Sequence, residues 1–197
     1  MKFAFFGTGE FSLMVLQELN NQGFTPSFIV CGEDKLVGRK RVMTAPATKS
    51  WGQEKGIPIL QPNKVSEIKQ IVADCDLFVL ASYGKILPQS VLDIPKHGTL
   101  NVHPSFLPKY RGASPLQSAI LNENETGVSI MLLVREMDAG PILMQRKTEI
   151  NWPPYCDELE VVTAKQGGQM LVEVIPQWVL GKITLVEQDH GSATYCV

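Results

Sequence analysis

Short apolar runs alternate with stretches of helical periodicity along the chain, and this alternation limits its fold more than any other feature. The runs expected to form strands are residues 3–7, 27–32, 57–60, 76–82, 98–103, 126–134, 141–150 and 183–188. Helical spacing separates them at 11–23, 45–56, 65–75, 112–124 and 157–181. Strands that alternate with helices form crossover units and a mostly parallel sheet. We therefore predict an α/β fold, with a Rossmann-like, doubly wound, mostly parallel sheet and helices on both faces.

Two stretches depart from this alternation. Residues 126–134 and 141–150 follow one another closely, so we expect a hairpin around 135–140. The one long irregular stretch runs from Gly32 to Thr44. A chain of 197 residues, 44% of them hydrophobic, is long enough for one globular domain with a sizeable core, which we assign to residues 1–197.

Composition and charge exclude several classes of function. The net charge of −2 argues against a general nucleic-acid coat, so DNA is not an expected partner. No apolar run could span a bilayer, and the opening segment "MKFAFFGTGEF" is not a signal peptide. The four cysteines are isolated, without a Cys/His cluster, which predicts reduced thiols in a cytoplasmic protein and no bound metal.

The turn after the first run, "GTGEFS", is similar to a dinucleotide-binding loop. The full fingerprint requires a third glycine at the position of Ser12, and the acidic residue expected after the second strand is ambiguous between Glu33 and Asp34. We interpret the segment as a tight strand-to-helix turn, and we expect no NAD.

The segment "LNVHP" offers a better candidate site. Asn101 and His103 lie two residues apart at the end of an expected strand, so their side chains point to the same side. Ligands collect at that end of a parallel sheet. Donors held in place stabilise a carbonyl oxygen that becomes an oxyanion, and histidine moves protons near neutral pH. The alternative is that the pair is structural.

The segment "REMDAG" adds a carboxylate between two expected strands. Asp138 could be a turn-forming residue, because Asp and Gly suit hairpins. It could also meet His103 in space, orient the imidazole and raise its pKa by its charge.

A basic loop follows the second strand. Arg39, Lys40 and Arg41 are either part of a solvated face or contacts for phosphate groups. Lys109 and Arg111 lie in another loop and could belong to the same basic rim.

Several of these segments resemble one known family. The family is that of the 10-formyltetrahydrofolate-dependent formyltransferases. Its opening turn resembles residues 5–12, its Asn-x-His signature resembles "NVHPSFLPKYRGASPLQSAI", and its Asp-bearing loop resembles "MDAGPIL". The "GRKR" loop and the "GASPLQSAI" helix resemble most closely the members that act on methionyl-tRNA. The resemblance implies the formyltransferase fold and assigns this chain to the catalytic domain. It also implies a C-terminal, barrel-like tRNA-binding domain, which is absent from this chain.

The implied reaction transfers a formyl group from 10-formyltetrahydrofolate, bound as a substrate, to the α-amino group of methionyl initiator tRNA. The resemblance gives Asn101, His103 and Asp138 the catalytic roles, and Arg39, Lys40 and Arg41 the contacts to tRNA. It implies folate contacts from Leu80, Ser82, Tyr83, Gly84, Ile86, Leu87, Arg135, Glu136 and Met137. It implies a pocket loop formed by Ser105, Phe106, Leu107 and Pro108.

Two other functions remain open from the sequence. The same chemistry could act on a nucleotide-linked amino sugar. The chain could also be a non-catalytic module that binds folate or a nucleotide.

Overall fold

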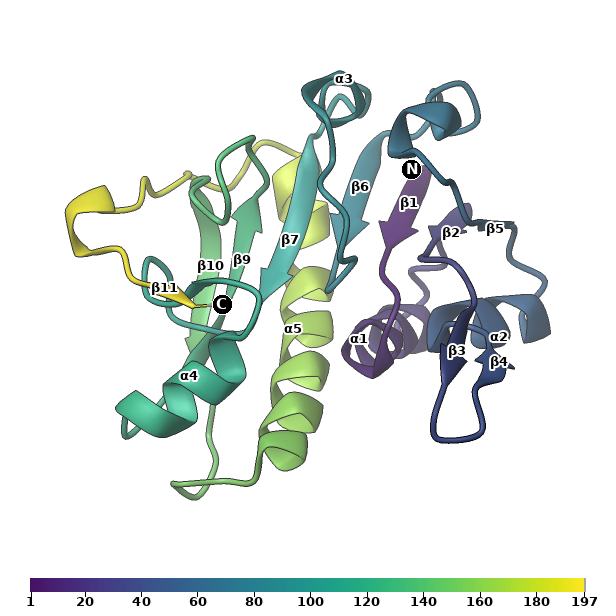
Figure 1. Cartoon of the computed structure of the whole chain (residues 1–197). Helices are drawn as coiled ribbons and strands as arrows, with labels where there is room; N and C mark the ends of the chain where they lie inside the picture. Colours follow the sequence, from purple (N-terminus) through teal and green to yellow (C-terminus); the bar gives the residue numbers. More distant parts are fainter. Residues whose placement is uncertain (197) are drawn as a thin grey trace.

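The computed structural model describes residues 1–196, which form one central sheet of seven strands in the order β10-β9-β7-β6-β1-β2-β5 (Figure 1). Neighbouring strands are parallel except at β9, which is antiparallel to both β7 and β10. The predicted α/β fold with a mostly parallel sheet is confirmed. The strands are β1 (Phe3–Phe6), β2 (Phe28–Val30), β5 (Ile59–Leu60), β6 (Leu77–Leu80), β7 (Thr99–His103), β9 (Gly127–Leu132) and β10 (Ile142–Lys147).

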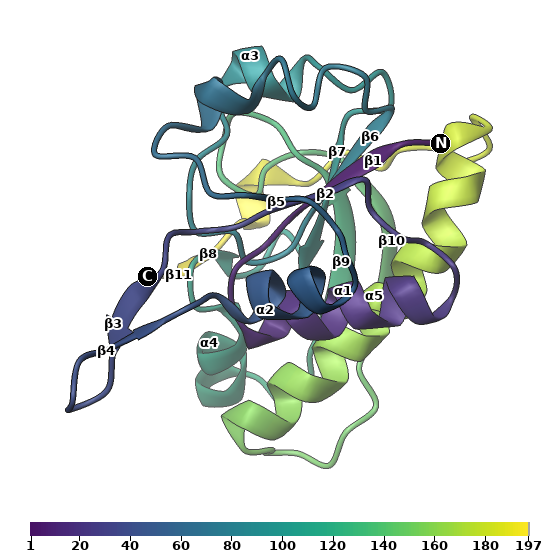
Figure 2. The ribbon, with the colours of Figure 1, turned by 90° about the vertical axis from the view of Figure 1, so that its right-hand side faces the viewer.

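Helices cover the two faces of the sheet unequally (Figure 2). The helices α1 (Glu10–Asn21), α2 (Ala47–Glu54) and the long α5 (Cys156–Val179) lie on one face. The short α3 (Gln89–Leu92) and the 3₁₀ segment η1 (Val65–Ile68) lie on the other. The helix α4 (Pro115–Asn122) packs beside α5.

Alternation of side chains along β1 builds the two layers of the core. Phe3 and Phe5 pack into the cluster that includes the apolar faces of α1 and α5. Ala4 and Phe6 point the other way, into the cluster that includes residues of η1 and α3. Successive residues of a strand point to opposite faces, so a wholly apolar strand can be buried on both sides.

The helix predicted over 65–75 is wrong beyond its first turn. Only Val65–Ile68 is helical, as a 3₁₀ turn, and tight turns follow it. The amide of Ile71 donates to the carbonyl of Ile68, the i+3 pattern of a tight turn. Val65, Ile68, Val72 and Cys75 nevertheless reach the core, which explains the helical spacing of the apolar residues.

The stretch 32–44, expected to be irregular, contains a hairpin. Its strands are β3 (Lys35–Val37) and β4 (Val42–Thr44), and it projects from the body of the molecule (Figure 2). Both strands are exposed, so burial imposes no alternation on their sequence.

The strand predicted over 183–188 is also wrong. That segment makes only an isolated bridge from Val186 to Ile142. The last part of the described chain instead forms the 3₁₀ segment η2 (His190–Ser192) and β11 (Tyr195–Cys196), which pairs in parallel with β8 (Arg111–Gly112).

The strand order places a switch point between β1 and β6. From β1 the chain proceeds through β2 to β5 on one side, then returns to β6 and continues to β10 on the other. In open sheets of this kind, ligands bind beyond the carboxyl ends of the strands near such a point. None of the helices formed by residues 1–196 has the length and apolar composition needed to cross a membrane.

Candidate active site

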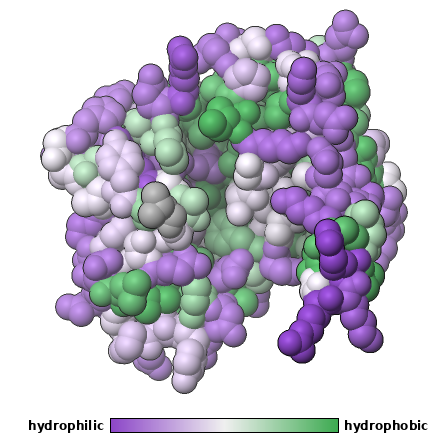
Figure 3. Space-filling model, in the orientation of Figure 1, coloured by the Kyte–Doolittle hydropathy of each residue, from purple (hydrophilic) through white to green (hydrophobic). Residues whose placement is uncertain are grey.

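A cavity of about 520 Å³ opens beyond the carboxyl ends of β6 and β7. Figure 3 shows it as a hollow with an apolar floor near the centre of this face. Its walls come from the first turn of α1, the segment after β6, the end of β7, the start of α4 and the loop between β9 and β10. The lining residues are Phe11, Leu80, Ser82, Tyr83, Gly84, Lys85, Ile86, Asn101, Val102, His103, Pro104, Gly112, Ala113, Pro115, Leu116, Gln117, Met137, Asp138 and Glu160.

Strand β7 delivers two polar side chains to this cavity. Leu100 and Val102 pack into the core cluster that includes α5. The alternation of the strand therefore turns Asn101 and His103 toward the other face, where they line the cavity while remaining only 5% and 4% exposed.

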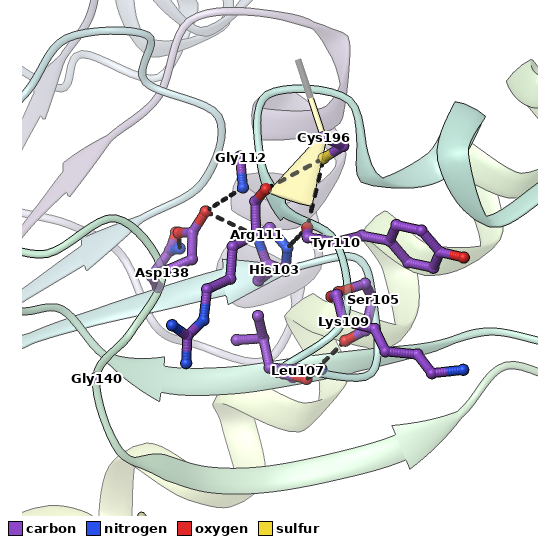
Figure 4. A network of polar contacts seen from close by, with 12 residues as sticks. His103, Ser105, Leu107, Lys109, Tyr110, Arg111, Gly112, Asp138, Gly140 and Cys196 are labelled. Carbon is purple, nitrogen blue, oxygen red and sulfur yellow. Dashed lines mark hydrogen bonds and ion pairs between the residues drawn. The ribbon is translucent and has the colours of Figure 1, made fainter. Parts of the chain in front are cut away.

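The loop between β9 and β10 brings Asp138 to the same place. Its Oδ2 lies 3.8 Å from Nδ1 of His103, and its Oδ1 accepts a 3.5 Å hydrogen bond from Nδ2 of Asn101. The amide of Gly112 donates to Oδ2 at 2.8 Å (Figure 4). The three residues proposed as catalytic from the sequence thus meet in one cavity.

The imidazole of His103 is held by the main chain. Its Nε2 lies 2.9 Å from the carbonyl oxygen of Tyr110, which can only accept, so Nε2 carries the proton and Nδ1 of the neutral ring is bare. Burial lowers the pKa of His103 below its ordinary value, while the charge of Asp138 and the bond to Tyr110 oppose this shift. The charge of Asp138 raises this pKa, as expected from the sequence, but the effect of burial is larger and the net shift is downward.

The expected folate contacts divide into two sets. Leu80, Ser82, Tyr83, Gly84, Ile86 and Met137 line the cavity. Leu87, Arg135 and Glu136 do not: Leu87 packs into the core beneath α3, and the other two lie in the loop that carries Asp138.

The expected pocket loop supports the site from behind. Ser105, Phe106, Leu107 and Pro108 do not line the cavity, whereas Pro104 does. The Oγ of Ser105 donates to the carbonyl of Lys109 within the loop (Figure 4). The carbonyl of Ser105 accepts from Ser129, which attaches the loop to β9. It returns the chain to Tyr110, whose carbonyl holds His103.

The basic residues occupy different environments. Arg39, Lys40 and Arg41 are exposed at the tip of the β3–β4 hairpin, which forms the projection with a hydrophilic end in Figure 3. Lys109 pairs with Glu123 at 2.8 Å. Arg111 is only 2% exposed, so its expected place in a basic rim is wrong.

The "GTGEFS" segment forms the tight turn expected from the sequence. The Oγ of Ser12 accepts from the amide of Thr8 and donates to the carbonyl of Ala81. The position where the dinucleotide fingerprint requires glycine therefore holds a side chain bonded to the neighbouring segment. Within residues 1–196, no three His, Cys, Asp or Glu side chains gather as metal ligands would.

Sequence reasoning missed several residues of the site. Lys85, Gln117 and Glu160 line the cavity, and Gly112 and Gln188 bond to Asp138. The signal for Gly112 was its identity as glycine: its φ is +120°, and a Cβ there would collide with the carbonyl oxygen of Cys196. Gln188 carried none, since its partners are distant in sequence.

Comparison with known proteins identifies the family. A model described as "Formyl transferase" matches residues 1–175. The chain belongs to the formyl transferase family. The formyl transferases most similar in sequence include methionyl-tRNA formyltransferases of Listeria monocytogenes serotype 4a (strain HCC23) and Geobacillus sp. (strain WCH70), both 41% identical over 98% and 99% of this chain. The chain spans 64% and 63% of their lengths.

Solved structures of formyl transferases share the fold. An N-formyltransferase from Helicobacter canadensis, in complex with folinic acid and dTDP-3-aminofucose, superposes with a TM-score of 0.75 at 19% identity over 100% of this chain and 70% of its own. Phosphoribosylglycinamide formyltransferase from Streptococcus pneumoniae TIGR4 superposes with a TM-score of 0.72 at 19% identity. The superposition covers 90% of this chain and 98% of that protein's chain.

Proposed function

We propose that this chain transfers the formyl group of 10-formyltetrahydrofolate to the α-amino group of methionyl initiator tRNA, with residues 1–197 as the catalytic domain. The observation that carries the chemistry is the meeting of Asn101, His103 and Asp138 in one cavity. The 41% identity to methionyl-tRNA formyltransferases supports the choice of acceptor. We place the activity in the cytoplasm, in keeping with four unpaired cysteines.

The donor would bind along the segment after β6. Ile86 is 89% exposed and Met137 is also exposed, although both are apolar and both line the cavity. A flat ring between them would cover this apolar surface, and nearby main-chain groups of Ser82 and Gly84 could bond its polar edge. The H. canadensis relative, solved with folinic acid, supports a folate as the donor.

The three polar side chains would divide the chemistry. The bare Nδ1 of His103 would accept the proton that the attacking amine loses. The Nδ2 of Asn101 would donate to the oxygen on which negative charge develops, and the newly protonated His103 could add a second donor. As the tetrahedral intermediate collapses, the bond between the formyl carbon and N10 of the folate would break. His103 would return its proton to N10, so that tetrahydrofolate leaves and the ring is neutral again. Asp138 would stabilise the imidazolium by its charge, at the 3.8 Å separation from Nδ1.

The β3–β4 hairpin would contact the acceptor. Its tip carries Arg39, Lys40 and Arg41, all exposed, and among the ion pairs between described residues none involves these three. Exposed cations that project from a weakly acidic protein are suited to phosphate contacts.

The test is a direct assay with alternative acceptors. The protein is mixed at low salt with 10-formyltetrahydrofolate and one of three acceptors: methionyl initiator tRNA, a dTDP-linked amino sugar or glycinamide ribonucleotide. We expect formyl-methionyl-tRNA. Formylation of the sugar or of the ribonucleotide alone would replace the acceptor in this proposal, and binding of folate with no transfer to any acceptor would make the chain a binding module.

A hairpin variant separates the acceptors further. Replacing Arg39, Lys40 and Arg41 with glutamine should raise the KM for tRNA. The slope of log affinity against log salt concentration should also become shallower, by roughly 0.9 for each lost phosphate contact. The matched control is Lys64→Gln with Lys182→Gln, two exposed lysines outside the hairpin. Unchanged kinetics in the hairpin variant would argue against a tRNA acceptor.

A further inference from the structure

Gln188 is a buried amide with each of its polar atoms bonded. Its side chain belongs to a residue only 5% exposed. Its Nε2 donates to the carbonyl oxygens of Asp138 at 2.8 Å and Gly140 at 2.6 Å. Its Oε1 accepts from Nη2 and Nε of Arg111 at 2.7 and 3.2 Å.

The chemistry of the partners determines which way this amide points. A guanidinium group only donates and a main-chain carbonyl only accepts. The oxygen of the amide must therefore face Arg111 and its nitrogen must face the loop that carries Asp138. A glutamate or an apolar residue could not satisfy both sides.

The two partners of Gln188 belong to the two segments that hold His103 and Asp138. Arg111 lies between Tyr110, whose carbonyl accepts from His103, and Gly112, whose amide donates to the Asp138 carboxylate (Figure 4). Asp138 is thus bonded at its side chain by Gly112 and at its carbonyl by Gln188. One buried amide connects both supports.

The main chain at Asp138 needs this support. Its φ of +48° lies in the left-handed region, which costs a residue with a side chain on the order of 1–2 kcal/mol. Such a conformation persists where its surroundings hold it in place. The bonds from Gln188 hold the carbonyl of Asp138 and that of Gly140 two residues later.

Arg111 makes the connection rigid. Its guanidinium is buried, and none of the ion pairs formed within residues 1–196 includes it. A buried cation must be hydrogen-bonded to remain stable. Besides Gln188, its acceptors are Nδ1 of His190 at 3.2 Å and the hydroxyl of Tyr195 at 3.4 Å, both in the last part of the described chain.

We propose that Gln188 is a positioning residue for the formyl-transfer site, which sets the distance between Asp138 and His103 by tying the Asp138 loop to Arg111. This inference rests on the proposed function. The family model ends its match at residue 175, so the match says nothing of Gln188.

Two variants of Gln188 separate the two sides of the amide. Gln188→Met removes both, whereas Gln188→Glu keeps an acceptor for Arg111 and loses the donor to the Asp138 loop. The matched control is Gln177→Met, because Gln177 is an exposed glutamine on α5 that also donates to a main-chain carbonyl. For each protein, kcat and the KM for the folate donor are measured, and the His103 ring is titrated by NMR.

We expect both Gln188 variants to lose about 10- to 100-fold in kcat, with the folate KM nearly unchanged, because a misplacement of about 1 Å at a catalytic site can cost roughly 10²-fold. The titration of His103 should move to lower pH in Gln188→Met, because the charge of Asp138 that favours the protonated ring is no longer held nearby. Other titratable groups near His103 are Lys85 and Glu160, which line the cavity, and the thiol of Cys196, which bonds to the carbonyl of Tyr110. The bonds of Gln188 go to Arg111, Asp138 and Gly140, so its replacement leaves those groups in place.

A lower Tm with wild-type kcat and wild-type His103 titration would reduce Gln188 to a stabilising residue and overturn the proposal. Full activity and an unchanged titration in Gln188→Glu would do the same, since that variant lacks the donor. If the wild-type protein formylates no acceptor, the proposed function fails. The NMR titration then still decides whether Gln188 holds Asp138 against His103.

Discussion

The ring of His103 has one nitrogen bonded to a main-chain carbonyl and the other facing a carboxylate. The first contact determines the tautomer, and the second stabilises the ring when it gains a proton. Burial favours the neutral ring. This combination suits a group that must accept a proton briefly and release it again.

The lowered pKa of His103 predicts a pH dependence of stability. The unfolded chain binds a proton at His103 near pH 6.5, whereas the folded chain binds it only at lower pH. Stability should therefore decline as pH falls through about 6.5, by up to about 1.4 kcal/mol per pH unit from this group. Urea unfolding at pH 7.5 and 5.5 measures it. The free energy of unfolding of His103→Gln should fall less over this interval, and equal losses in the two proteins would contradict the assignment.

Removal of the amide of Asn101 should slow the chemical step. Asn101→Ala should lower kcat about 10²–10³-fold, the usual cost of one oxyanion donor, because Nδ2 is the donor aimed into the cavity beside Asp138. Steady-state kinetics with 10-formyltetrahydrofolate and methionyl-tRNA measure the loss. Asn122→Ala is the control, because that asparagine is exposed and its side chain donates to Ser118 within α4, away from the cavity. A rise in KM at constant kcat would show that Asn101 binds substrate and does not act on the transition state.

Part of this site could be predicted from sequence. The two-residue spacing of Asn101 and His103 predicted that they share a face, and the resemblance to formyltransferases selected Asp138 as their partner. The tautomer of His103 and the burial of Arg111 could not be predicted, because both depend on contacts with segments that lie nearby only after folding. The same limit hid Gln188, which is 77 residues from Arg111.

At the scale of elements, the close approach of α5 to β7 on one side and to α1 on another explains the glycine pair in the middle of that helix. Glycine weakens a helix by about 1 kcal/mol relative to alanine. A Cβ on Gly167 would overlap Cγ1 of Val102, and one on Gly168 would overlap the side chain of Glu18 on α1. Gly167 therefore lowers the intrinsic stability of the helix but allows it to pack closely against β7, the strand that carries Asn101 and His103.

Gly167→Ala should destabilise the protein despite its better helix propensity. The added methyl group must displace Val102, a stiff buried residue between Asn101 and His103, at a cost of typically 1–3 kcal/mol. Thermal unfolding measures the loss of stability, and kcat should fall as well. Gln169→Ala, at an exposed position on the same helix, should leave both unchanged. A higher Tm in Gly167→Ala would contradict the close packing.

Elements with a continuous apolar run, or with a periodic apolar face, were the most predictable. β1, β6, β7, α1 and α5 appear where the apolar pattern predicted them. The β3–β4 hairpin and the β8–β11 pair had no such pattern, because the hairpin is exposed and the strands of the pair are two residues long. The turns after η1 bury the same residues that a helix would, so spacing alone could not distinguish them.

At the scale of the whole molecule, the cavity joins parts of the chain from Phe11 to Glu160. A ligand that contacts these parts together stabilises the folded state and not the unfolded one. Folinic acid at about 100 times its Kd should add about 2.7 kcal/mol, which raises Tm by roughly 5–10 °C for a protein of this size. Differential scanning fluorimetry measures the shift.

The control for this prediction is a change at the rim. Ile86→Asp places a charge on an exposed apolar residue of the cavity and should reduce the shift at the same ligand concentration without lowering the Tm of the free protein. An unaltered shift in the variant would mean that folinic acid binds elsewhere.

The pairing of β11 with β8 has a consequence for how the protein is made. A ribosome synthesises residues 183–196 after every residue that lines the cavity, and domains begin to fold from their N-terminal side during synthesis. The sheet can form while Arg111 still lacks Gln188, His190 and Tyr195, so a nascent chain passes through a stage with a formed core and an unfinished site. The contacts around Arg111 and Asp138 are therefore completed only after residues 183–196 have been synthesised, well after the residues that line the cavity.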